Sequence, residues 1–89
     1  MANQNLIAGE WVAGATTVAD VNPSDVSDVV GEFAVADEAQ VDAAIDAAES
    51  AAPGWATATP AERAAVLERV GLDLDARAAE LGEQLSREE

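Results

Sequence analysis

The sequence of 89 residues contains no cysteine, no histidine and no lysine. Without cysteine and histidine the chain has no thiolate nucleophile, no imidazole base and none of the side chains that usually bind zinc. Without lysine it can form no Schiff base, and it lacks the lysine of a phosphate-binding loop. The remaining reactive groups are carboxylates, hydroxyls and four arginines. This composition argues against catalysis by the chain alone.

A leader sequence and long apolar runs are also missing. No apolar run approaches the roughly 18 residues of a membrane-spanning helix. The start, Met1-Ala2-Asn3-Gln4, has neither the basic nor the apolar part of a signal peptide. The lack of cysteine is compatible with a reducing compartment. We therefore expect a cytoplasmic protein that does not enter a membrane.

Basic side chains are scarce relative to acidic ones. Eighteen acidic residues against four arginines give a net charge of −14 and a pI of about 4.1. Such a charge repels the phosphates of nucleic acids and anionic membrane surfaces, so neither is an expected partner. The acid excess resembles that of proteins from salt-loving archaea, in which molar salt screens the self-repulsion. The alternative is a bacterium with a GC-rich genome; we favour the halophile.

Residues 1–36 predict short antiparallel strands. Gly9 can adopt the positive φ that a tight hairpin turn needs. Asn22-Pro23-Ser24-Asp25 predicts a second turn, because Pro fixes φ and the flanking side chains can bond to nearby backbone. The strands predicted around these turns are residues 6–7, 11–12, 16–21 and 28–33. Strands so short and so few are not stable by themselves.

The rest of the chain predicts two helices, of which the first spans residues 37–52. Asp37 and Gln40 have the spacing of a capping box. Pro53-Gly54 is expected to end the helix. Trp55 then falls in the connector, where we expect it to anchor the packing between elements. One helical face carries the apolar residues Val41, Ala44, Ile45 and Ala48.

The second helix is predicted over residues 60–88. Thr59 caps it, Pro60 takes the first helical position and Glu62 completes a capping box. An apolar stripe follows over about five turns. Its members are Leu67, Val70, Leu74, Ala78, Leu81 and Leu85. Because so short a chain offers little surface to cover this stripe, we expect it to lie on a larger body.

Charged pairs on the second helix are predicted from spacing. Asp73–Arg77 and Glu83–Arg87 are acid-before-base pairs at i, i+4. A calcium loop beginning at Asp73 is rejected, because the required glycine and third ligand are absent.

Other sites are rejected on similar grounds. Asp42 and Asp46 share a helix face, but a di-metal carboxylate site also needs histidine. The glycines form neither a GxGxxG pattern nor a phosphate-binding loop. An acyl carrier would need a serine after Asp73, where this chain has Leu74. No catalytic, cofactor-binding or metal-binding residue is therefore assigned.

Several short motifs occur in a characteristic order and at characteristic distances. They are NLIAGEWV (5–12), VNP (21–23), VVGEF (29–33), VDAAI (41–45), Trp55 and TPAER (59–63). Together they resemble the N-terminal segment of the aldehyde dehydrogenase superfamily, from about residue 5 to residue 89. Asn22-Pro23-Ser24-Asp25 and Ser86-Arg87-Glu88-Glu89 are most similar to the subgroup that acts on 2-oxoglutarate semialdehyde (2,5-dioxovalerate). The chain then represents an α+β segment of the α/β aldehyde dehydrogenase fold.

The resemblance implies that residues 1–89 are the N-terminal portion of the cofactor-binding domain of a longer enzyme. That enzyme would oxidise an aldehyde to a carboxylate with NAD or NADP, through a cysteine nucleophile and a glutamate that activates water. The motifs that carry those groups are not in this chain, so we expect the segment alone to be inactive and to bind no cofactor. Its expected partners are the remainder of the enzyme and, through it, other subunits of a homo-oligomer. The alternative is a small acidic helical binding module without enzymatic activity.

Overall fold

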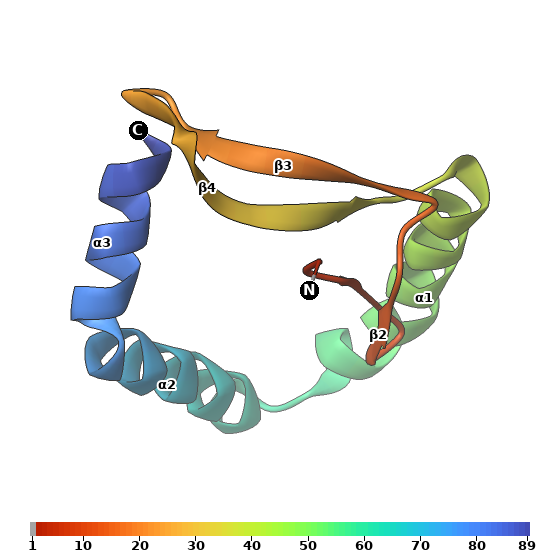
Figure 1. The fold of residues 1–89 in the computed structure, drawn as a ribbon. Coiled ribbons are helices and arrows are strands. Elements are labelled where there is room, and N and C mark those ends of the chain that lie inside the picture. The colour runs from red at the N-terminus through yellow and green to blue at the C-terminus, as the bar shows by residue number, and fades with distance from the viewer. Residues whose placement is uncertain (1) are drawn as a thin grey trace.

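A computed structural model of the chain describes residues 2–89, and its strands all precede its helices (Figure 1). This arrangement confirms the predicted α+β segment. The elements are β1 (Asn5–Ile7), β2 (Glu10–Val12), β3 (Thr16–Asn22), β4 (Asp25–Val35), α1 (Glu38–Thr57), α2 (Pro60–Ala76) and α3 (Ala78–Glu88). The strands form two separate antiparallel pairs, β1 with β2 and β3 with β4.

The first pair is the predicted hairpin around Gly9. Leu6 lies opposite Trp11, and the strands are joined by Ala8 and Gly9. Both joining residues have positive φ, 52° and 80° respectively. Turns of this kind match the natural twist of two antiparallel strands, which explains why so short a hairpin closes here.

The second pair is longer than predicted. The two strands pair from Thr16 opposite Val35 to Asn22 opposite Asp25, around the predicted Pro23–Ser24 turn. The fourth predicted strand was residues 28–33, but β4 starts at Asp25 and continues to Val35. Its last two residues pair with Thr17 and Thr16 of β3. Asn3 also bonds to β4: the Asn3 N–H donates to the Glu32 carbonyl at 2.7 Å, and the Ala34 N–H donates to the Asn3 carbonyl at 2.8 Å.

Gly14 lies where the backbone approaches the end of β4 too closely for any side chain. A Cβ atom built on Gly14 would lie 2.6 Å from both the N and the O of Val35. We expect Gly14→Ala to break the neighbouring hydrogen bond, in which Ala15 N–H donates to Val35 O at 2.9 Å. Amide exchange at Ala15 should become at least about tenfold faster, equivalent to roughly 1.4 kcal/mol. Gly82→Ala is the control, because a Cβ there meets nothing within 4 Å, and Ala is preferred to Gly in a helix by about 1 kcal/mol.

Helix α1 begins as predicted but ends later. The capping box at Asp37 and Gln40 is present, with Gln40 N–H donating to Asp37 Oδ1 at 2.8 Å. The expectation that Pro53-Gly54 ends the helix at residue 52 was wrong, since α1 continues to Thr57. Pro53 removes one N–H from the helix but not its carbonyl, which accepts a hydrogen bond from the Thr57 hydroxyl at 3.0 Å. Trp55 therefore lies within the last turn of α1 rather than in the connector.

The long helix predicted over residues 60–88 is divided at Arg77. Its start is correct, because Thr59, Pro60 and Glu62 form the predicted cap. Arg77 has φ −107° and ψ 13°, outside the helical region, and its N–H is shared between the carbonyls of Asp73 and Leu74. The bend turns α3 toward the β3–β4 hairpin, whereas a straight helix of that length would extend about 40 Å. The two helices expected after the strands are therefore three.

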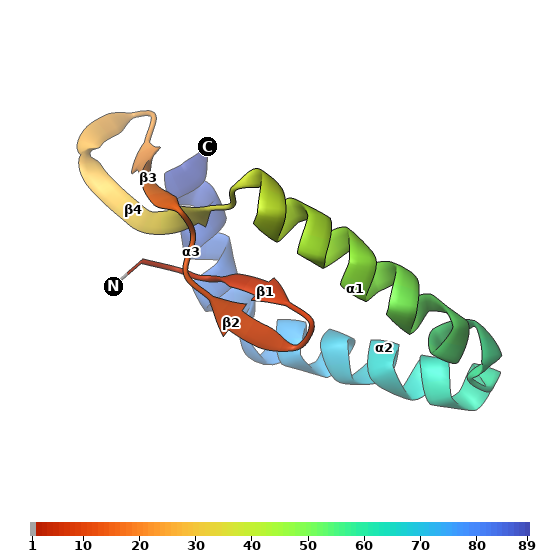
Figure 2. The ribbon, with the colours of Figure 1, turned by 90° about the vertical axis from the view of Figure 1, so that its right-hand side faces the viewer.

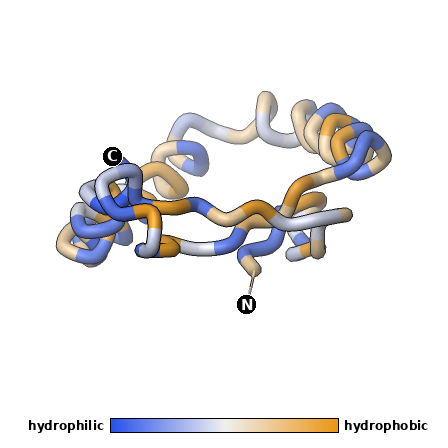
Figure 3. The backbone as a smooth tube through the Cα atoms, turned by 45° about the horizontal axis from the view of Figure 1, so that its top comes forward, coloured by the Kyte–Doolittle hydropathy of each residue, from blue (hydrophilic) through white to orange (hydrophobic). Residues whose placement is uncertain are grey.

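The chain forms an open frame rather than a packed domain (Figures 1 and 2). Its radius of gyration is 16.7 Å, against about 12 Å for a compact chain of this length. Its accessible surface is 6792 Å², whereas a compact protein of 9.1 kDa exposes about 4,900 Å². None of residues 2–89 is buried. Apolar segments are instead distributed around the frame (Figure 3).

Candidate functional site

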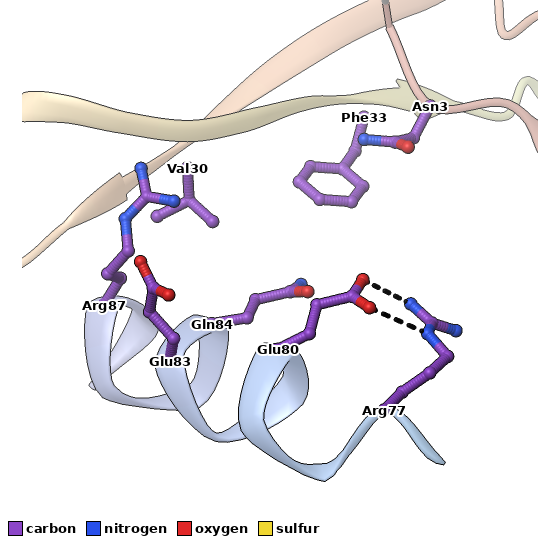
Figure 4. A pocket seen from close by; sticks show the side chains of 8 residues that line it. All are labelled: Asn3, Val30, Phe33, Arg77, Glu80, Glu83, Gln84 and Arg87. Carbon is purple, nitrogen blue, oxygen red and sulfur yellow. Dashed lines mark hydrogen bonds and ion pairs between the residues drawn. The ribbon is translucent and has the colours of Figure 1, made fainter. Parts of the chain in front are cut away.

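An open pocket of about 440 Å³ lies between α3 and the β3–β4 hairpin (Figure 4). One wall is formed by Val30 and Phe33 of β4 and by Asn3, which is bonded to β4, and the opposite wall is formed by the α3 side. That wall consists of Arg77, Glu80, Glu83, Gln84 and Arg87. The bend at Arg77 creates the pocket, because it turns α3 back toward the strands.

The contact between α3 and the β3–β4 hairpin is called the joint below. It contains an ion pair between Arg87 on α3 and Asp28 on β4. The Arg87 Nε donates to Asp28 Oδ2 at 3.0 Å, and Nη2 donates to Oδ1 at 2.5 Å. Arg87 also donates to the Val29 carbonyl at 3.4 Å, and the Asn22 amide donates to Asp28 Oδ2 at 3.3 Å. The paired side chains are only about one-third exposed, 36% for Arg87 and 31% for Asp28. A two-bond guanidinium–carboxylate contact is among the stronger ionic contacts in proteins.

Two carboxyl groups at the joint respond to pH in opposite directions. The hydrogen bond from Arg87, and then that from Asn22, lowers the pKa of Asp28 below its ordinary value of 3.8. Asp28 thus stabilises the joint above pH 3.8 and loses this effect as the pH falls through its lowered pKa. Partial burial raises the pKa of Asp20, and the neighbouring Glu88 carboxylate raises it further. The contribution of Asp20 is therefore favourable only in acid and is lost as the pH rises through its raised pKa.

Neither predicted i, i+4 pair on the second helix forms. Arg77 pairs with Glu80 instead of Asp73, at 2.7 Å between Nη2 and Oε1. Asp73 pairs with Arg69 at 3.4 Å. The bend at Arg77 explains the first exchange, because it places Glu80 in the first turn of α3. Arg87 pairs with Asp28 instead of Glu83, and Asp28 accepts two hydrogen bonds from it.

The pocket offers little chemistry of its own. Both of its arginines are already paired with carboxylates, and the chain has no cysteine or histidine. Within residues 2–89 no group of three or more acidic side chains is arranged to hold a metal ion, and Asp42 and Asp46 on α1 belong to no such cluster. Asp73 and Asp75 lie inside α2. No helix of this part of the chain combines the length and apolarity that a bilayer crossing requires.

The apolar surface is the more distinctive feature. Ile45 on α1 is 59% exposed and Leu67 on α2 is 68% exposed. Val70, Leu74 and Leu85 of the predicted stripe are also exposed, while Leu81 is half-buried. Exposure of so many large apolar side chains is typical of surfaces that contact another protein.

A depression of about 410 Å³ between β1 and α1 belongs to this apolar surface. Its lining includes Leu6, Ile7, Val41 and Ile45. Asn5 also borders it, and the Asn5 amide nitrogen is buried without a hydrogen-bond partner within residues 2–89. A buried donor without an acceptor costs about 1–3 kcal/mol, so this position calls for an acceptor from outside the described contacts.

These features describe a segment of two antiparallel strand pairs and three helices with an extensive exposed apolar surface. The profile of the aldehyde dehydrogenase family matches residues 11–89. The chain belongs to this family, which confirms the resemblance seen in the motifs.

Curated relatives give the same result. A probable aldehyde dehydrogenase of Mycobacterium bovis is 43% identical over 79 residues, covering 88% of this chain and 16% of the relative. A fluoroacetaldehyde dehydrogenase of Streptantibioticus cattleyicolor is 41% identical over 78 residues, covering 86% of this chain and 15% of the relative. An alpha-ketoglutarate semialdehyde dehydrogenase of Haloferax volcanii is 36% identical over 89 residues, covering 98% of this chain and 18% of the relative. The chain thus spans less than a fifth of the length of these relatives. No solved structure matches it.

Proposed function

We propose that this chain is the N-terminal packing segment of an enzyme that oxidises an aldehyde to a carboxylate with NAD or NADP. The observation that carries the proposal is the family match over residues 11–89, in a chain whose apolar side chains are uncovered. The remainder of such an enzyme supplies the missing cover. The segment would form part of the cofactor-binding domain without itself touching the cofactor.

In this proposal residues 1–89 take part in no chemical step of the reaction. In that reaction the aldehyde carbon would give up hydride to the bound nicotinamide, and water would supply the second oxygen of the carboxylate. The products are one carboxylate, one reduced nicotinamide and two protons. A cysteine nucleophile cannot come from this chain, which has none. Its contribution is structural: it covers apolar surface of the remaining protein and fixes the helices that line it.

For the substrate we propose 2-oxoglutarate semialdehyde. The Haloferax volcanii relative bears the name of this activity and aligns over 98% of the chain, and the Asn22–Asp25 and Ser86–Glu89 motifs are similar to that subgroup. A carboxylate-bearing aldehyde would need a cationic contact. Because the two arginines of the pocket, Arg77 and Arg87, are already paired with carboxylates, we assign this contact to the remainder of the enzyme. We further propose that the enzyme is a cytoplasmic homo-oligomer.

The test compares the chain with the full-length protein. We expect residues 1–89, purified alone, to reduce neither NAD nor NADP with any small aldehyde above a buffer control. The full-length protein should reduce one of the two, and 2-oxoglutarate semialdehyde should give a higher kcat/KM than aldehydes without a carboxylate. The absorbance of the reduced nicotinamide measures the activity of residues 1–89 and of the full-length protein. Turnover by residues 1–89, or none by the full-length protein, would contradict the proposal; a higher kcat/KM for uncharged aldehydes would contradict only the substrate.

A further inference from the structure

One ion pair differs in kind from the others within residues 2–89. Arg69–Asp73 and Arg77–Glu80 join neighbours three or four residues apart. Arg87 and Asp28 are 59 residues apart in sequence and connect the last helix to a strand of the hairpin. Figure 1 shows the result: the C-terminal end of α3 lies beside the β3–β4 turn and closes that side of the frame.

We propose that Arg87 and Asp28 form a clasp that fixes α3 against the β3–β4 hairpin and thereby sets the bend at Arg77. Asn22 is the positioning residue of the clasp, because its amide holds the same Asp28 oxygen that accepts from Arg87 Nε. The Val29 carbonyl accepts a further bond from Arg87 Nη2. The guanidinium is thus bonded to β4 through a side chain and through the backbone. A lysine could not form the same contact, because it lacks the planar fork of donors.

The charge around the clasp makes Arg87 decisive. The neighbouring Asp20 and Glu88 carboxylates repel each other across the α3–β3 contact, and Glu83 lies near Arg87 on the same helix. Without Arg87 the joint would bring acidic groups of the hairpin against acidic groups of α3. Arg87 offsets this repulsion, so its removal weakens the contact between the helix and the strands.

The experiment is a double-mutant cycle read by amide hydrogen exchange in the full-length protein, without substrate. The variants are Arg87→Gln, Asp28→Asn and the two combined. Each single substitution should speed exchange about two- to fivefold in two separate segments, residues 16–35 and 78–88, as expected for one partly exposed ion pair. The combined variant should exchange no faster than either single one, because the second substitution removes a contact already lost. Arg69→Gln is the matched control and should leave both segments unchanged.

The clasp is contradicted if Arg87→Gln leaves either segment unchanged, or if the two single effects add in the combined variant. Arg87→Lys covers the case in which Arg87→Gln does not fold: it keeps the charge but should still accelerate exchange in both segments. Because the full-length protein is used, the experiment rests on the proposed function. Dehydrogenase activity of the unsubstituted protein reports on that function, whereas the exchange cycle reports on the clasp alone.

Discussion

Residues 1–89, heated alone in dilute buffer, should lose their helical circular dichroism gradually, without a cooperative transition. Cooperative unfolding requires a core that is lost all at once, and none of residues 2–89 is buried. The accessible surface exceeds that of a compact protein of equal mass by roughly 1,900 Å². The helices keep their capping boxes, but most of the stability of helices in proteins comes from packing of an apolar face, and these faces are exposed here.

Salt should raise the helical signal without restoring cooperativity. The net charge of −14 repels itself over a screening length of about 10 Å at 0.1 M salt and about 3 Å at 1 M. Potassium chloride therefore relieves the repulsion, but it cannot supply the missing apolar partner. The measurement is circular dichroism against temperature at several KCl concentrations. A sharp transition at low salt would identify an autonomous domain, and the small binding module would then be the better interpretation of the chain.

Local rules predicted the starts of α1 and α2 well. Both capping boxes form as the sequence indicates, because each depends on side chains and backbone only three residues apart. The hairpin at Gly9 and the turn at Pro23–Ser24 also follow from residues at the turn itself. These features need no knowledge of the rest of the fold.

The predictions were wrong where the structure depends on contacts between residues far apart in the sequence, and at Pro53. Proline inside a helix removes one hydrogen bond and crowds the preceding turn, yet α1 continues through Pro53 to Thr57. No local pattern marks the bend at Arg77, which instead accompanies the approach of α3 to the hairpin. The pairing of Arg87 with Asp28 was missed because spacing favours the neighbour Glu83, whereas the partner chosen is 59 residues away. The family motifs could be recognised without the fold, but they do not indicate these contacts.

Trp55→Ala in the full-length protein should lower the free energy of unfolding by about 3–5 kcal/mol, the usual cost of truncating a buried tryptophan. Trp55 lies in the last turn of α1, two residues before the helix ends, and is 50% exposed in residues 2–89. Half of this residue is thus available to the rest of the proposed enzyme, at the point where the chain turns from α1 into α2. We expect this ring to anchor both helices to the larger body.

The kinetic parameters distinguish this packing role from a contact with substrate. If Trp55 acts only through packing, the folded Trp55→Ala enzyme should keep its KM for the aldehyde while its thermal stability falls. Trp55→Phe is the matched control and should retain most of the stability, because it preserves an aromatic ring in the same place. The measurements are thermal unfolding and steady-state kinetics of the same preparations. An unchanged melting temperature together with an altered KM would place Trp55 at the substrate instead, and residues 1–89 would then take part in binding as well as in packing.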